Sequence, residues 1–315
     1  MSQRNKTVFN IVKWIILISA YVFLVYKLSR IDYWVELKAS FSSIPLLRLL
    51  LFIVVLLLMP FNWMIEAKKW QRLNINSFPL SFGNSLKAVL AGLNTGFVTP
   101  NRIGDFAGRI LFLPNNKSIA GVALSMINSL TQNLITITFG LAGAVVYFMQ
   151  FRPQTHYGNY LLFVVLIFFI ALVVFFTFPD WIGKIKFKKI HEKLNEAIKT
   201  LSTFNKKDLM VILLISMSRY VVYSFQFYLM LQFFGIHLSL VQAFASIPAM
   251  YLFVTITPSM AAAEPAIRSS YAVLVFSIFS SNQIGMMLCG IVIWIINFVI
   301  PMLAGSFIMA KQKRP

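Results

Sequence analysis

Two carboxylates stand out because each lies in a mostly apolar stretch and is followed four residues later by an arginine. The pairs are Asp105 with Arg109 and Glu264 with Arg268. Residues at positions i and i+4 share one face of a helix, so each pair can form a local ion pair. Burying an unpaired carboxylate is costly, and acids within membrane segments usually serve function or are tightly paired. We therefore predict that both acids belong to a functional site.

Each pair sits in a region of the same design: an apolar arm, a Thr-Pro break, a short polar linker, the acid with its arginine, and a second apolar arm. The two regions are 81–114 and 240–280. The second arm of the first region has only about ten residues before a proline, which is too short to cross a bilayer. We interpret both regions as re-entrant hairpins, whose irregular tips must be surrounded by protein or a wet cavity.

The predicted topology makes the first hairpin enter from the cytoplasm and the second from outside. Such an inverted repeat is common in transporters that bind their substrate near the midplane. We therefore predict that the Thr99-Pro100 and Thr257-Pro258 tips lie close together near the bilayer centre. The alternative is a chance similarity of two segments that each contain a structural salt bridge.

Other polar residues fall in or near the predicted spans. Arg219 lies deep in one of them and is favoured as a site residue, whereas Arg48 lies near a span end and can snorkel to the surface. Amides within spans more often join helices than bind ligands. The predicted substrate-binding residues are Asn94, Arg102, Asp105, Arg109, Arg219, Glu264 and Arg268.

Together with Lys87, this set holds five cations and two acids, an excess of three positive charges. Such an excess is unfavourable in a low-dielectric site unless an anion or water enters it. The fork of arginine donors suits phosphate oxygens, and helices that begin after each Thr-Pro break would add favourable dipoles. We therefore predict a substrate with an anionic headgroup, most simply a phosphate. The alternative places Lys87 and Arg102 at headgroup level, facing bulk lipid.

The sequence offers little for metal binding or nucleophilic catalysis. His156, His191 and His237 lack metal-ligand spacing, and the single Cys289 lies in an apolar run. We expect no metal, no cofactor and no catalytic residue, and because no ATPase motif is present we expect gradient-driven or passive movement. Two alternatives stay open: a membrane enzyme that modifies lipid headgroups, with Asp105 or Glu264 as general base, and a structural membrane partner.

The composition predicts an all-α polytopic membrane protein that forms a single transmembrane domain over residues 1–315. The chain is 59 % hydrophobic and only 12 % charged, which is too apolar for a soluble surface. We expect about six full transmembrane helices in addition to the two hairpins, with the first as an uncleaved helix rather than a signal peptide. The predicted spans are 8–26, 44–65, 118–149, 158–178, 209–234 and 283–309.

Most lysines and arginines lie in short segments between the apolar runs. With six spans, the N-terminus, the segment 66–72, the loop 179–208 and the C-terminus fall on one side, which the positive-inside rule makes cytoplasmic. We therefore expect a bacterial inner-membrane protein with both termini in the cytoplasm. The net charge of +19 is then explained by anionic lipid headgroups rather than by nucleic acid.

The long basic loop 179–208 contains apolar residues at helical spacing with lysines between them. The apolar positions are Ile190, Leu194, Ile198 and Leu201. This pattern is typical of an amphipathic helix on the anionic inner leaflet, and an ordinary solvated linker helix fits it equally well. Membrane lipids are the expected partners, and a homo-oligomer is left open.

The stretch NTGFVTPNRIGDFAGRILFL resembles a motif of the flippase-like membrane proteins related to the transmembrane region of lysylphosphatidylglycerol synthase. The second hairpin resembles a later motif of that family through Pro258 and Glu264, with Ala261, Ala262 and Ala263 where glycines are usual. The residues that match the first motif are Asn94, Pro100, Arg102, Gly104, Asp105 and Arg109, with aspartate replacing glutamate.

The soluble aminoacyl-transferase half of the synthase is not expected within these 315 residues. The resemblance therefore implies translocation of a lipid or lipid-linked substrate rather than its synthesis.

The predicted orientation can be tested at the basic loop. A cysteine introduced by Asn195→Cys is expected to react with a membrane-impermeant maleimide only after the cells are permeabilised, because the positive charge around it keeps the loop in the cytoplasm. The single native cysteine, substituted by alanine, provides the unlabelled background. Labelling of residue 195 in intact cells would reverse the topology.

Overall fold

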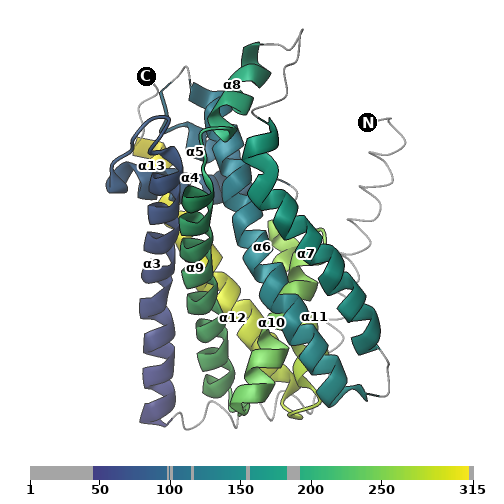
Figure 1. Cartoon of the computed structure of the whole chain (residues 1–315). Helices are drawn as coiled ribbons and strands as arrows, with labels where there is room; N and C mark the ends of the chain where they lie inside the picture. Colours follow the sequence, from purple (N-terminus) through teal and green to yellow (C-terminus); the bar gives the residue numbers. More distant parts are fainter. Residues whose placement is uncertain are drawn as a thin grey trace, which may run out of the picture.

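The computed structural model describes residues 45–97, 99, 102–114, 117–153, 157–182 and 192–311, and the regular elements of this part of the chain are helices (Figure 1). Four runs are long and apolar enough to cross a membrane. They are α3 (Leu46–Asn74), α6 (Ser118–Phe151), α9 (Lys206–Phe233) and the run Gln283–Lys311, which joins α12 (Gln283–Trp294), the π-helical turn η4 (Ile295–Val299) and α13 (Ile300–Lys311).

These four runs correspond in length and composition to the predicted spans 44–65, 118–149, 209–234 and 283–309, while the number of spans stays a prediction. The predicted span 158–178 lies within α7 (Tyr157–Ile182), a helix that is not among the four. The predicted span 8–26 lies outside the described residues. The long apolar run that begins at Ser118 is one helix of 34 residues.

Both predicted hairpin regions fold as pairs of short helices. The first contains α4 (Phe82–Phe97) and α5 (Asp105–Ile110), and the second contains α10 (Leu240–Ile256), the 3-10 turn η3 (Ala261–Ala263) and α11 (Glu264–Phe276). None of the four arms reaches the ~20 residues that a full span needs. The alanines that replace the family's usual glycines occupy η3, a turn with negative φ in which alanine is unstrained.

The long helix that follows each hairpin packs against the other hairpin. The span after the first hairpin, α6, packs against α10 of the second, and α13, which ends the span after the second hairpin, packs against α4 of the first. The preceding spans α3 and α9 pack against each other. In Figure 1, α4 and α5 lie in the upper part of the molecule and α10 and α11 in the lower part. One apolar core surrounds each hairpin.

Glycines allow the arms of the first hairpin to approach closely. A Cβ on Gly108 of α5 would lie 2.5 Å from the Thr95 hydroxyl of α4 and would overlap the Ala91 carbonyl oxygen. The same hydroxyl donates a hydrogen bond to the Gly104 carbonyl at 2.6 Å and accepts one from the Gly108 amide at 3.1 Å. Thr95 therefore clamps α5 onto α4 where no side chain separates the two backbones.

Glycines also bring the last span against both hairpins. A Cβ on Gly290 of α12 would lie 2.8 Å from the Ser269 amide nitrogen of α11. A Cβ on Gly305 of α13 would overlap the Leu90 carbonyl oxygen of α4. The last span thus contacts one hairpin through α12 and the other through α13.

The segment 66–72, predicted as a cytoplasmic loop, is instead the end of α3. The helix continues to Asn74, and the side chains of Glu66 and Lys69 are buried. The loop prediction was wrong because it rested on the local density of positive charge, whereas the helical face of α3 continues through this segment.

The basic residues nevertheless gather at one end of the bundle. Arg72 at the end of α3 pairs with Asp208 at the start of α9 at 2.8 Å, and Lys117 pairs with Glu196 of α8 at 4.0 Å. The helix α8 (Glu192–Leu201) confirms a helix over Leu194, Ile198 and Leu201 of the loop 179–208, whereas Ile190 lies outside the described residues. The helix packs against α6.

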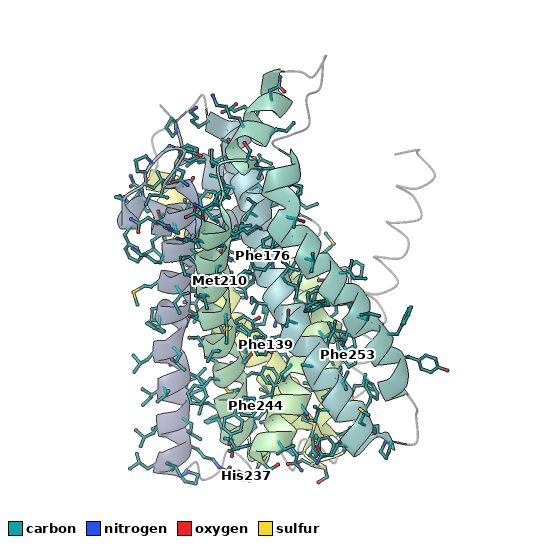
Figure 2. All side chains as sticks on the ribbon, viewed as in Figure 1. Phe139, Phe176, Met210, His237, Phe244 and Phe253 are labelled. Carbon is teal, nitrogen blue, oxygen red and sulfur yellow. The ribbon has the colours of Figure 1, made fainter. Side chains whose placement is uncertain are left out.

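Away from this end, the outward face of α3 is apolar. Figure 2 shows side chains that project from α3 without a neighbouring helix, and the exposed ones include Leu46, Leu50, Ile53 and Leu57. Such a face suits the hydrocarbon interior of a bilayer.

Because α4 and α5 approach closely at Gly108, a methyl group added there is expected to lower the stability of the protein. Gly108→Ala is expected to destabilise the protein by about 1–3 kcal/mol, because α4 and α5 must separate to admit the Cβ. Gly83→Ala on α4 is the matched control, since a Cβ there has no neighbour within 4 Å, and it should leave the unfolding temperature unchanged or slightly raised. Thermal unfolding in detergent measures both, and equal unfolding temperatures would contradict the packing argument.

Candidate functional site

The tips of the two hairpins are joined by an ion pair. Arg102 of the first tip donates from Nε to Glu264 Oε1 at 2.7 Å, and its Nη2 donates to Oε2 of the same carboxylate. The two residues are 162 positions apart in the chain. This bidentate contact brings the turn at Arg102 against the start of α11, while the approach of the two Thr-Pro breaks and their depth in the membrane stay predictions.

The backbone at Arg102 is adapted to this contact. Its φ is 56°, in the left-handed region that residues other than glycine rarely adopt. The turn is held by the Thr99 hydroxyl, which accepts a hydrogen bond from the Gly104 amide at 2.7 Å. The guanidinium lies 4.0 Å from the centre of the Phe298 ring, a cation–π contact with the last span.

The predicted local pair of the second hairpin is present but is not the main contact of its carboxylate. Arg268 Nη2 lies 3.6 Å from Glu264 Oε2, which is an ion pair too long for a hydrogen bond. The Arg268 guanidinium also lies 5.9 Å from the Tyr251 ring centre. Glu264 is therefore bonded mainly to the other hairpin.

The pair of the first hairpin is confirmed and extended. Arg109 Nε donates to Asp105 Oδ2 at 2.8 Å, and Arg109 Nη2 donates to Glu66 Oε1, also at 2.8 Å. Arg109 is almost fully buried, and its guanidinium lies 5.1 Å from the Trp70 ring centre. Through Arg109, α5 is bound to α3.

Glu66 is the centre of a buried charge cluster that joins four helices. Besides Arg109, it accepts from Asn128 Nδ2 of α6 at 2.7 Å and from Arg219 Nη1 of α9 at 3.1 Å. The Lys69 ammonium lies 3.6 Å from Glu66 Oε2. A carboxylate with so many charge-assisted donors is held firmly in place.

Other side chains of this cluster also donate within it, although one buried donor, Arg109 Nη1, has no partner among the described residues. Lys69 Nζ donates to the Asn128 carbonyl at 3.0 Å and to the Ser216 hydroxyl at 3.2 Å. Arg219 Nε donates to Asn62 Oδ1 at 3.1 Å. The deep position predicted for Arg219 thus places it in the cluster, bound to two residues of α3.

Glu66 and Lys69 were missed by the sequence analysis, which placed them in a loop. A usable signal was present: Asn62, Glu66 and Lys69 are spaced by four and three residues, which continues one face of α3. This polar face would have indicated a helix that extends beyond residue 65 and carries buried charges.

One further prediction needs correction. Lys87 was counted in the buried or half-buried set, but its side chain is exposed. The Asn94 amide donates to the Ser306 hydroxyl and so joins α4 to α13. A part of Asn94 in substrate binding stays a prediction.

Within the described residues, the two clusters hold five cations and three carboxylates, an excess of two positive charges. The cations are Lys69, Arg102, Arg109, Arg219 and Arg268, and the acids are Glu66, Asp105 and Glu264. No group of three His, Cys, Asp or Glu residues that could hold a metal is found in this part of the chain.

A comparison with known families gives one match over most of the chain. The family model of the lysylphosphatidylglycerol synthase transmembrane region matches residues 10–305. The chain belongs to this family. No curated protein and no solved structure gave a significant match. The family match covers both hairpin regions, both charge clusters, three of the four long apolar runs and the fourth as far as residue 305. The resemblance noted from two motifs therefore extends over nearly the whole chain.

The central position of Glu66 predicts a large effect of its charge. Glu66→Gln is expected to destabilise the protein by roughly 3–5 kcal/mol, because three buried cations lose their shared carboxylate. Glu196→Gln is the matched control: its pair with Lys117 is 4.0 Å long and both side chains are about a third exposed, so the cost should be at most about 1 kcal/mol. Unfolding temperatures in detergent compare the two, and similar values would contradict the central role of Glu66.

Proposed function

We propose that this protein translocates a lipid or lipid-linked substrate with an anionic headgroup between the two leaflets of a membrane. The observation that carries the proposal is the ion pair between Arg102 and Glu264, which joins two hairpins within clusters that hold two excess cations. A site of this kind favours the entry of an anion, because a counter-charge relieves the repulsion between the cations.

The arrangement of the hairpins supports the proposal. Each hairpin has arms too short to cross the membrane, and the two lie in opposite parts of the bundle with their tips in contact (Figure 1). We propose that they enter the membrane from opposite sides as an inverted repeat. A headgroup could then reach the junction from either leaflet while its acyl chains stay in lipid.

The basic end of the bundle supports the proposed orientation. Arg72, Lys117 and the helix α8 lie at the end where α3 stops and α9 begins. We propose that this end faces the cytoplasm of a bacterial cell and that α8 lies near anionic lipid of the inner leaflet.

The proposal predicts transport that depends on Arg102. Proteoliposomes with the wild-type protein are expected to exchange fluorescent phosphatidylglycerol between leaflets, measured by dithionite quenching of the outer leaflet. Arg102→Gln should lower the initial rate at least tenfold. Arg102→Gly should do the same, because glycine accepts the positive φ but supplies no guanidinium. Arg219→Gln, which removes a cation from the buried cluster, is also expected to slow exchange.

The control removes the same charge elsewhere. Arg48→Gln, at the start of α3, should exchange lipid at the wild-type rate. Survival of transport in both Arg102→Gln and Arg219→Gln would sink the anionic-site proposal. Mass spectrometry of the recovered lipid separates the alternatives: an unchanged lipid is expected of a translocase, whereas a new lipid species would identify a headgroup-modifying enzyme.

A further inference from the structure

We infer that the phosphate group of the substrate binds at Arg268, and that the cluster around Glu66 serves to hold the helices rather than to bind substrate. This inference rests on the proposed function and deepens it, because it assigns different roles to the two charge clusters. It follows from a comparison of two arginines that occupy equivalent places in the two hairpins.

Arg109 and Arg268 each follow an acid by four residues, yet their surroundings differ. Arg109 has charge-assisted hydrogen bonds to two carboxylates, Asp105 and Glu66, both at 2.8 Å. Arg268 has one carboxylate, Glu264, at 3.6 Å. Both oxygens of Glu264 already accept from Arg102. Arg268 thus has fewer and longer carboxylate contacts than Arg109.

Arg268 has a buried donor, Nε, without a hydrogen-bond partner among the described residues. Arg109 Nη1 is also without a partner, but it lies on a less exposed side chain. A buried donor without a partner destabilises the protein. A ligand that accepts a hydrogen bond from it therefore gains more binding free energy than a ligand that bonds to a donor already hydrated by water. A phosphate supplies acceptor oxygens in the geometry of the guanidinium fork, which makes it the matching chemical class.

Access also distinguishes the two arginines. The Arg268 side chain is 21 % exposed and Arg102 is 32 % exposed, whereas Arg109 is only 5 % exposed. The first cluster is less open on the whole, because its Lys69 is fully buried and its Arg219 is 17 % exposed. A headgroup would therefore reach Arg102 and Arg268 more readily than Lys69 or Arg109.

Aromatic and hydroxyl groups complete the surroundings of Arg268. The Tyr251 ring of α10 faces the guanidinium, and Tyr271 lies three residues further along the same face of α11. The Tyr271 hydroxyl is hydrogen-bonded to the Thr257 hydroxyl at 2.8 Å. This hydrogen bond can be exchanged for one to a glycerol or phosphate oxygen, while the Tyr271 ring lies tilted against Phe253 with ring centres 5.6 Å apart.

Glu264 then acts as a competitor of the bound phosphate. Its carboxylate lies beside Arg268 and repels an incoming anion, while Arg102 holds it in place from the other hairpin. The neutral amide of Glu264→Gln removes this repulsion. It should therefore bind anions more tightly than the wild type, which is the opposite of the effect expected if Glu264 itself held the headgroup.

The experiment is an equilibrium titration of the full-length protein in a non-ionic detergent with short-chain phosphatidylglycerol, followed by calorimetry. Arg268→Gln is expected to bind at least tenfold more weakly than the wild type. Arg268→Lys, which keeps the charge but loses the fork, should bind several-fold more weakly. The matched control Arg48→Gln should stay within twofold of the wild type. Wild-type affinity in Arg268→Gln overturns the inference; if that variant does not fold, wild-type affinity in Arg268→Lys overturns it.

Two further arms test the competition and the source of the phosphate. Glu264→Gln is expected to bind phosphatidylglycerol several-fold more tightly, and weaker binding would overturn the competitor role. Inorganic phosphate is expected to bind much more weakly than the lipid, and equal affinities would overturn a lipid headgroup as the ligand.

Because these titrations measure binding without transport, the two proposals fail separately. Binding that depends on Arg268 in a protein that exchanges no lipid sinks the proposed function alone. Lipid exchange that is unchanged in Arg268→Gln sinks this inference alone.

Discussion

The burial of Glu66 is the constraint on which the arrangement of the first half of the bundle depends. A carboxylate in the interior of an apolar bundle must be matched by donors, and here they come from α3, α5, α6 and α9. None of these helices can shift far without leaving a buried charge unmatched. The short helix α5, with only six residues, could hardly keep its place by apolar packing alone. Its position follows from Arg109, which is bound to both Asp105 and Glu66, and from the Thr95 hydroxyl, which joins it to α4.

In the second half of the bundle, the carboxylate of Glu264 has fewer partners than that of Glu66. Glu264 takes its main donor from the other hairpin, and Arg268 is left with one long contact. The two halves therefore share a helix order but differ in how closely their charges are paired. The shorter and more numerous contacts of the first half give rigidity, and the long contact of Arg268 leaves binding energy for a ligand. The reciprocal packing of α6 on α10 and of α13 on α4 connects the two.

Local patterns predicted the parts of the site that lie close together in the sequence. The i, i+4 spacing gave the pair of Asp105 and Arg109, and the Thr-Pro breaks marked the two hairpins. The bridge from Arg102 to Glu264 had no sequence signal that names the partners, because they meet only after both hairpins have packed. Glu66 was not predicted as a site residue for another reason. Its basic neighbours Lys68, Lys69 and Arg72 have the composition of a loop, although they continue a helix. Charge density describes a surface well, but it does not show which face of a helix is buried.

The π-helical turn η4 makes the last span sensitive to its length rather than to its composition. A π turn holds one residue more than an α-helical path would, which rotates everything after it by about 100° relative to everything before it. The turn separates Gly290, which faces α11, from Gly305, which faces α4. An insertion or deletion of one residue there would rotate α13 about the helix axis relative to α12. The side chains of each segment would be unchanged, but one of the two glycines would no longer face its hairpin. Related chains should therefore vary freely in apolar residue type along this span while keeping the number of residues between the two glycines.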